Sequence, residues 1–185
     1  MKARALVLAA TFLSISVSLS AQENETKETI GYSNVTEFGL LSASPRGVSL
    51  EGTTAHGFSI NKQHHFGFGT GIGINLSTNS AVSYMPIFFN YRFYFKPEKT
   101  FSPHASIAIG GLTLEEGYGI YSSVTMGFRA GKFSFSSGLS FMPFVATKHY
   151  YDYYYDEWGI YQSITKSESK WSYPFGITIK CGFAF

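Results

Sequence analysis

The chain has 185 residues, of which only 14% are charged and 18% are aromatic. Average soluble domains carry about 25% charged residues, and disordered chains are poor in aromatic ones, so this composition excludes intrinsic disorder. A single cysteine, Cys181, excludes an internal disulfide framework and a cysteine-based zinc cluster. The formal net charge of +2 comes from Lys2 and Arg4, which leaves no basic surface for nucleic acid.

The first 21 residues have the pattern of a secretory signal peptide. Lys2 and Arg4 precede an apolar run over 5–17, and small residues follow at 18–21. The apolar run is shorter than the roughly 20 residues of a membrane-spanning helix, so we expect cleavage after Ser20 or Ala21 and export of the protein. Residues 22–29 are polar and predict a short N-terminal arm.

From residue 30 onward, apolar side chains recur at every second position, which is typical of β-strands with two different faces. The end of the chain is the clearest case. Over 171–185 the odd positions are aromatic, aliphatic or cysteine, and the even positions are small or polar. The pattern predicts eight strands over 33–44, 48–61, 64–76, 84–95, 101–111, 118–130, 133–144 and 171–185.

The charged residues within these predicted strands lie on the phase opposite the aromatic residues. They are Glu37, Glu51, Arg92, Arg129 and Lys180. If the apolar phase faces lipid, these five side chains point into the interior, where two acids and three bases can pair with one another. We therefore predict an interior charge network at these positions.

The connecting segments alternate in length. Those at 61–63, 96–100 and 131–132 are short, whereas those at 77–83, 113–117 and 145–170 are longer, as expected when tight periplasmic turns alternate with outer loops. The sequence thus predicts an all-β fold, an eight-stranded antiparallel up-and-down transmembrane β-barrel over 30–185 with a long outer loop at 145–170.

These features together resemble the small outer-membrane β-barrel proteins of Gram-negative bacteria, of the OmpA and OmpX type. In that family the terminal strand with its final aromatic residue is the signal read by the barrel-assembly machinery, and Phe183 and Phe185 match that closing pair. The resemblance implies localisation in the outer membrane. It also implies outer-membrane lipid, lipopolysaccharide and the assembly machinery as partners.

An eight-stranded barrel has an interior that its own side chains fill, so we expect a structural or surface-interaction protein rather than a diffusion pore. The predicted contact region is the outer loop, because tyrosine and tryptophan are common on recognition surfaces. Its aromatic residues are Tyr150, Tyr151, Tyr153, Tyr154, Tyr155 and Trp158. The same loop is equally compatible with two strands that extend above the membrane as a hairpin.

Two other functions are weighed against this one. A secreted soluble β-barrel or sandwich that binds a ligand would use the apolar phase as its core. A lipid A-modifying enzyme or a protease, as the resemblance to small outer-membrane barrels allows, would use a histidine with serine or acidic partners near the outer rim. His149 is the histidine in that region, with Asp152 and several serines in reach. We expect no catalytic residue, cofactor or metal, and we expect His56, His64 and His65 to be solvated or interfacial near the inner edge.

Overall fold

The computed structural model describes residues 30–44, 47–76, 83–115, 117–155 and 161–185. The predicted signal segment and the arm at 22–29 lie outside these residues. The described chain forms ten β-strands. Within it, no helix is long and apolar enough to cross a membrane.

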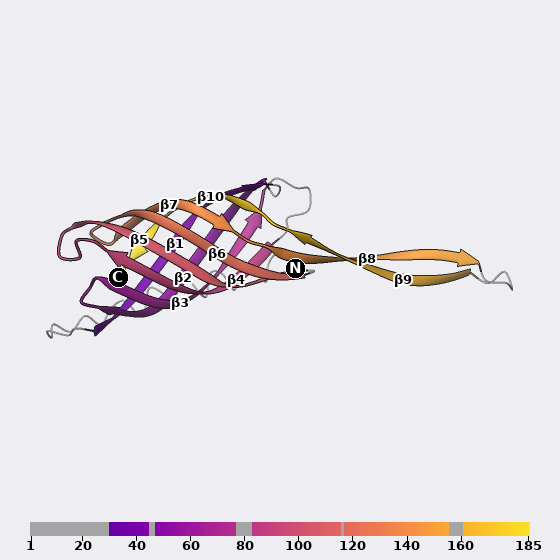
Figure 1. The fold of residues 1–185 in the computed structure, drawn as a ribbon, viewed down its shortest axis with the longest axis horizontal. Helices are drawn as coiled ribbons and strands as arrows, with labels where there is room; N and C mark the ends of the chain where they lie inside the picture. The colour runs from indigo at the N-terminus through magenta and orange to yellow at the C-terminus, as the bar shows by residue number, and fades with distance from the viewer. Residues whose placement is uncertain (1–29, 45–46, 77–82, 116, 156–160) are drawn as a thin grey trace.

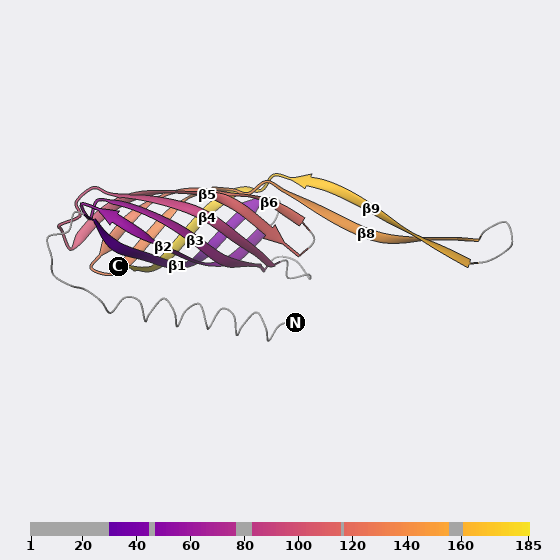
Figure 2. The ribbon, with the colours of Figure 1, turned by 90° about the horizontal axis from the view of Figure 1, so that it is seen from below.

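Eight of the strands close into an antiparallel up-and-down barrel, which confirms the predicted all-β, eight-stranded barrel (Figures 1 and 2). Neighbouring strands pair in chain order from β1 to β7, and β10 closes the barrel by pairing with both β7 and β1. The barrel strands are β1 (Ile30–Ser44), β2 (Gly47–Ile60), β3 (His64–Asn75), β4 (Ser83–Tyr94), β5 (Phe101–Leu114), β6 (Gly117–Ala130), β7 (Phe133–Phe141) and β10 (Phe175–Ala184).

The other two strands form a β-hairpin that projects from one end of the barrel (Figure 1). It consists of β8 (Phe144–Tyr155) and β9 (Tyr161–Ser172), paired over their whole length. The predicted outer loop at 145–170 is therefore mostly regular strand. The hairpin begins beside two prolines, Pro143 and Pro174, which interrupt the long strands predicted over 133–144 and 171–185 because proline lacks an N–H for the ladder. Met142 donates its backbone N–H to the carbonyl of Pro174 at 3.0 Å.

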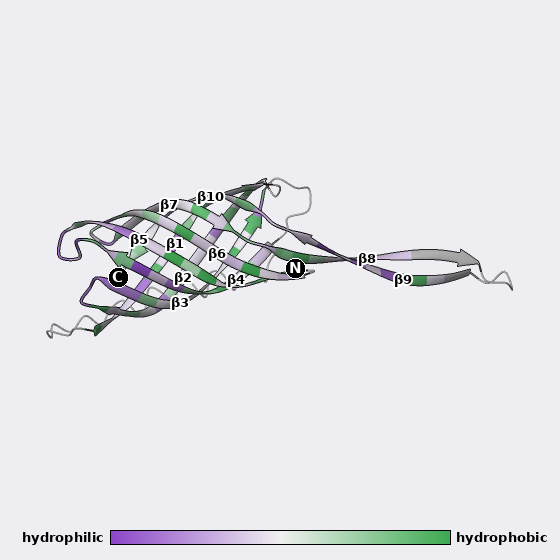
Figure 3. Cartoon of the chain, viewed as in Figure 1, coloured by the Kyte–Doolittle hydropathy of each residue, from purple (hydrophilic) through white to green (hydrophobic). Residues whose placement is uncertain are grey.

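The barrel wall has an apolar outside and a polar inside. Figure 3 shows the alternation of apolar and polar residues along the barrel strands. In β10, Ile177 is 59% exposed on the outside, whereas the next residue, Thr178, is 2% exposed inside. The charged residues of the eight barrel strands number five, and none of them lies on the outer surface. The predicted phase of the alternation is the one in the structure.

The two ends of the barrel differ. At one, here called the turn end, short connections at 61–63, 95–100 and 131–132 join the strands. Asn61, Lys62 and Gly131 adopt positive φ there, as tight hairpin turns require. The last residue of the chain lies at this end, where Phe185 and Asn34 exchange two backbone hydrogen bonds. The other end, which carries the β8–β9 hairpin, is called the hairpin end.

A belt of outward-facing phenylalanines surrounds the turn end. Ring centroids of successive members lie 5.6 Å apart for Phe58 and Phe66, 5.1 Å for Phe101 and Phe128, and 5.6 Å for Phe128 and Phe135. At the opposite end of the wall, Trp171 and Tyr173 stack at 6.0 Å. Aromatic residues thus flank the aliphatic middle of the outer surface on both sides.

Candidate functional site

The barrel interior contains two separate clusters of charged side chains, and the first is built around Glu51 of β2. Its carboxylate accepts hydrogen bonds from the hydroxyls of Tyr84 at 3.0 Å and Tyr121 at 2.9 Å. It also forms an ion pair with Lys180 of β10. The Lys180 ammonium donates a further hydrogen bond to the Tyr121 oxygen at 3.0 Å. Three strands and three donors therefore converge on one buried acid.

The second cluster is centred on Glu37 of β1. Arg92 of β4 crosses the interior to form an ion pair with the Glu37 Oε1 at 2.9 Å. The hydroxyls of Ser134 and Ser136 on β7 donate to the same oxygen at 3.2 and 3.4 Å. Arg92 also donates to Ser134 at 3.0 Å. Each charge has both an opposite charge and hydrogen-bonding partners, as buried ions require. The Arg92 Nε alone among these groups has no hydrogen-bond partner in the described chain.

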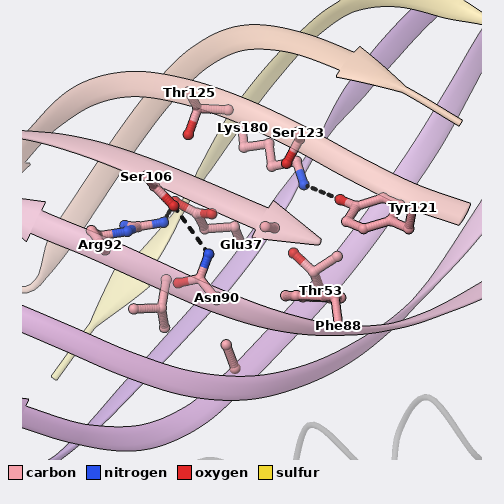
Figure 4. A pocket seen from close by; sticks show the side chains of 13 residues that line it. Glu37, Thr53, Phe88, Asn90, Arg92, Ser106, Tyr121, Ser123, Thr125 and Lys180 are labelled. Atoms are coloured by element: carbon pink, nitrogen blue, oxygen red, sulfur yellow. Dashed lines mark hydrogen bonds and ion pairs between the residues drawn. The ribbon is translucent and has the colours of Figure 1, made fainter. Parts of the chain in front are cut away.

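A small cavity separates the two clusters (Figure 4). It offers about 20 Å³ to the centre of a water molecule, which is enough for one or two waters. Asn90 lines the cavity, and its side-chain amide donates to the Ser106 hydroxyl at 3.0 Å. The side-chain oxygen of Asn90, Oδ1, has no hydrogen-bond partner in the described chain. A water in the cavity would satisfy that oxygen. The cavity is too small for a metabolite.

The remaining predicted network residue, Arg129, lies apart from both ion pairs. Its guanidinium stacks on the ring of Tyr94 at 4.6 Å and donates to the carbonyl of Pro97 in the turn at 95–100. Arg129 therefore links β6 to the turn at 95–100 through this hydrogen bond. The five predicted residues thus form two pairs and one turn anchor rather than one continuous network.

Two histidines lie inside the turn end of the barrel. His65 and His104 are almost fully buried, and neither ring nitrogen of either residue has a hydrogen-bond partner in the described chain. The expectation that His65 is solvated or interfacial near the inner edge is therefore wrong, because it shares the inward phase of Gly67 and Gly69. His56, by contrast, is half-buried on the outside, where it bonds the Tyr32 hydroxyl at 2.6 Å.

The glycine-rich strand β3 makes room for aromatic rings inside the barrel. Gly69 pairs with Phe88 across the β3–β4 ladder, and Gly73 pairs with Tyr84. A Cβ on Gly73 would lie 1.9 Å from the Tyr84 ring, and one on Gly69 would lie 2.5 Å from the Phe88 ring. Small and large residues thus complement each other, so that the interior is filled.

Sequence analysis did not assign Tyr84, Tyr121, Ser134 or Ser136 to the charge network, although they donate half of the hydrogen bonds in the two clusters. The signal was present in the spacing. Tyr84 has the same parity as Asn90 and Arg92, and Tyr121 has that of Arg129. Their parity places both tyrosines inside the barrel.

The structure describes the β8–β9 hairpin in part. Tyr150 and Tyr151 are exposed on β8, and the backbone of residues 153–155 pairs with β9. Trp158 lies outside the described residues. Within the described chain, no group of three or more histidine, cysteine or acidic side chains is arranged to hold a metal ion.

These features define the chain as a closed eight-stranded antiparallel β-barrel with an interior filled by two ion-pair clusters, and with a two-stranded extension at one end. A scan against protein-family models finds no family that matches the chain, and a search of curated proteins finds no relative.

Proposed function

We propose that this protein is an integral outer-membrane β-barrel of the OmpA and OmpX type, with a structural role in the membrane and a surface-interaction role through its hairpin. The single observation that carries the proposal is the distribution of charge over the barrel wall. All five charged residues of the barrel strands point inward, and the outward residues are mostly aromatic and aliphatic. A barrel in water would have the opposite arrangement, with charged residues outside and apolar residues inside, because large exposed apolar patches cause aggregation.

The height of the apolar band supports the same proposal. From Tyr173 to Phe183 the chain advances ten residues along the outer wall. At about 3.3 Å per residue and a strand tilt of about 40°, this span covers roughly 25 Å, which is the height of the apolar band in outer-membrane barrels. Charged side chains reappear just beyond the band, at Lys170, Glu168 and Lys166 on the hairpin. The proposed membrane boundary therefore lies near Trp171.

The filled interior argues for a structural barrel rather than an open channel. Both ion-pair clusters join strands that are not neighbours in the wall, and the cavity between them holds only a water or two. The proposed partners are outer-membrane lipid, lipopolysaccharide and, during biogenesis, the barrel-assembly machinery, for which Phe183 and Phe185 are the proposed signal.

The proposed contact surface is the hairpin, because it is the part of the described chain that extends beyond the barrel (Figure 1). Tyr150 and Tyr151 are exposed on it, as is Ile164 on the facing strand. Exposed tyrosines supply a large contact area at low entropic cost. An extracellular ligand or a neighbouring surface is the proposed partner.

The experiment that tests the membrane assignment uses two matched substitutions. Ile177 on the barrel wall and Ile164 on the hairpin are 59% and 47% exposed. If the wall faces lipid, Ile177→Arg lowers the free energy of unfolding by about 2 to 4 kcal/mol near the bilayer midplane, whereas Ile164→Arg in water changes it little. Urea unfolding in lipid vesicles, followed by gel mobility with and without boiling, measures both.

Fractionation of the wild type provides the accompanying control. The proposal requires recovery in the outer-membrane fraction and a heat-dependent shift in gel mobility. A monomeric protein that stays soluble without detergent, with equally small effects of Ile177→Arg and Ile164→Arg, would refute it and make the secreted ligand-binding barrel the better function.

A further inference from the structure

Lysine side chains are concentrated at the turn end of the barrel. Each of the three turns there carries at least one of them, and all are exposed. We call this set the lysine rim; it consists of Lys62, Lys96, Lys99 and Lys132. The same three turns contain one acidic residue, Glu98. These three turns therefore carry an excess of positive side-chain charge.

The hairpin end has the opposite balance. The connections at 45–46, 77–82 and 115–116 and the segment 145–170 contain six acidic residues against four basic ones. Without the signal segment the whole chain has equal numbers of acidic and basic residues. The lysine rim is thus a local feature of one end and does not reflect a generally basic protein.

The rim lies directly beside the phenylalanine belt. Lys96 follows Phe95, and Lys132 precedes Phe133. The Lys132 ammonium also lies 4.9 Å from the centroid of the Phe185 ring. A lysine at such a boundary extends its aliphatic stem along apolar surface and places its ammonium in the polar layer. If the belt marks the edge of the hydrocarbon, the ammonium groups lie at the depth of lipid headgroups.

We propose that the lysine rim binds the headgroups of anionic phospholipids in the leaflet that faces the turn end. The proposal rests on the proposed membrane function. The four lysines come from three separate turns rather than converging on one pocket, which suits several lipid headgroups around the barrel better than one soluble anion. Charge complementarity is the recognition chemistry, since anionic lipids attract basic residues at the membrane surface.

The test uses the full chain in nanodiscs of phosphatidylcholine with a minor share of phosphatidylglycerol, and measures by native mass spectrometry which lipids remain bound. We expect a preference for phosphatidylglycerol of about fivefold at each occupied lysine site at low salt. Salt at 0.5 M should reduce the preference, because screening shortens the range of charge attraction.

The variant with Lys62→Gln, Lys96→Gln, Lys99→Gln and Lys132→Gln should bind both lipids equally. Its conservative counterpart, with arginine at the same four positions, should keep the preference. The matched control is Lys166→Gln with Lys170→Gln on the hairpin, which should leave the preference unchanged.

Several outcomes would overturn the proposal. They are no preference in the wild type, a preference that survives in the four-glutamine variant, and an equal loss in the hairpin control. A preference that appears only after Glu23, Glu25 and Glu28 are changed to glutamine would show that the N-terminal arm occupies the rim instead. Failure of the wild type to enter nanodiscs would refute the membrane function itself, and insertion without lipid preference would refute the rim alone.

Discussion

Removing the carboxylate of Glu51 should destabilise the barrel more than any single hydrogen bond could. In Glu51→Gln the amide still accepts hydrogen bonds, but the Lys180 ammonium remains buried at 6% exposure without an opposite charge. Breaking a buried ion pair in this way costs about 3 to 5 kcal/mol. By contrast, Tyr84→Phe removes one of the donors to Glu51 and should cost about 1.5 to 3 kcal/mol, the range for a hydrogen bond to a charged group.

The assay is urea unfolding of the protein in lipid vesicles or detergent, with the folded fraction read from gel mobility without boiling. The double variant Glu51→Gln, Lys180→Met removes both charges and should recover most of the lost stability, because replacing a whole buried pair is often neutral. The reasoning would be refuted if Glu51→Gln and Lys180→Met, each made alone, lowered the free energy of unfolding by under about 1 kcal/mol. It would equally be refuted if the double variant lost the sum of what these two single variants lose.

Three further outcomes are expected. Gly73→Ala should cost about 1 to 3 kcal/mol, because its Cβ would meet the Tyr84 ring, whereas Gly111→Ala has open space and should not reduce urea stability by a similar amount. Replacing the hairpin segment 148–168 by a short turn should leave heat-modifiable gel mobility intact and abolish any surface adhesion, and loss of the folded band would contradict this. Phe185→Ala should lower the folded yield in cells but not after refolding in detergent; equal losses in both would assign Phe185 a purely structural role.

The strands were predictable because the barrel imposes a simple rule on each residue. A wall with one apolar and one polar face forces a period of two, and that period is readable wherever a strand runs regularly, as in β10. The observed ends of β7 and β10 differ from the predicted strand ends because prolines interrupt the hydrogen-bond ladder there. Pro143 and Pro174 were visible in the sequence, but their proximity depends on how β7 and β10 pair.

The partners inside the barrel were beyond the reach of sequence reasoning. Glu51 and Lys180 are 129 residues apart in the chain, and Glu37 and Arg92 are 55 apart. Which acid meets which base depends on the stagger between strands around the closed barrel, a property of the whole sheet. The odd or even position of each residue in its strand identified the charged side chains that point inward, Arg129 among them. That Arg129 lies apart from Glu37 and Glu51 could be learned only from the structure.

The hairpin depends on the barrel for its stability. An isolated two-stranded ribbon is marginal in water, and in the described chain β9 pairs with β8 alone. Its base is fixed because Phe144 and Ala146 of β8 pair with Gly119 and Gly117 of β6. The barrel, in turn, closes through β7 and β10 without any contribution from the hairpin strands. The barrel therefore closes independently of the hairpin, so a change in the hairpin that abolishes the proposed surface contact need not alter the barrel that supports it.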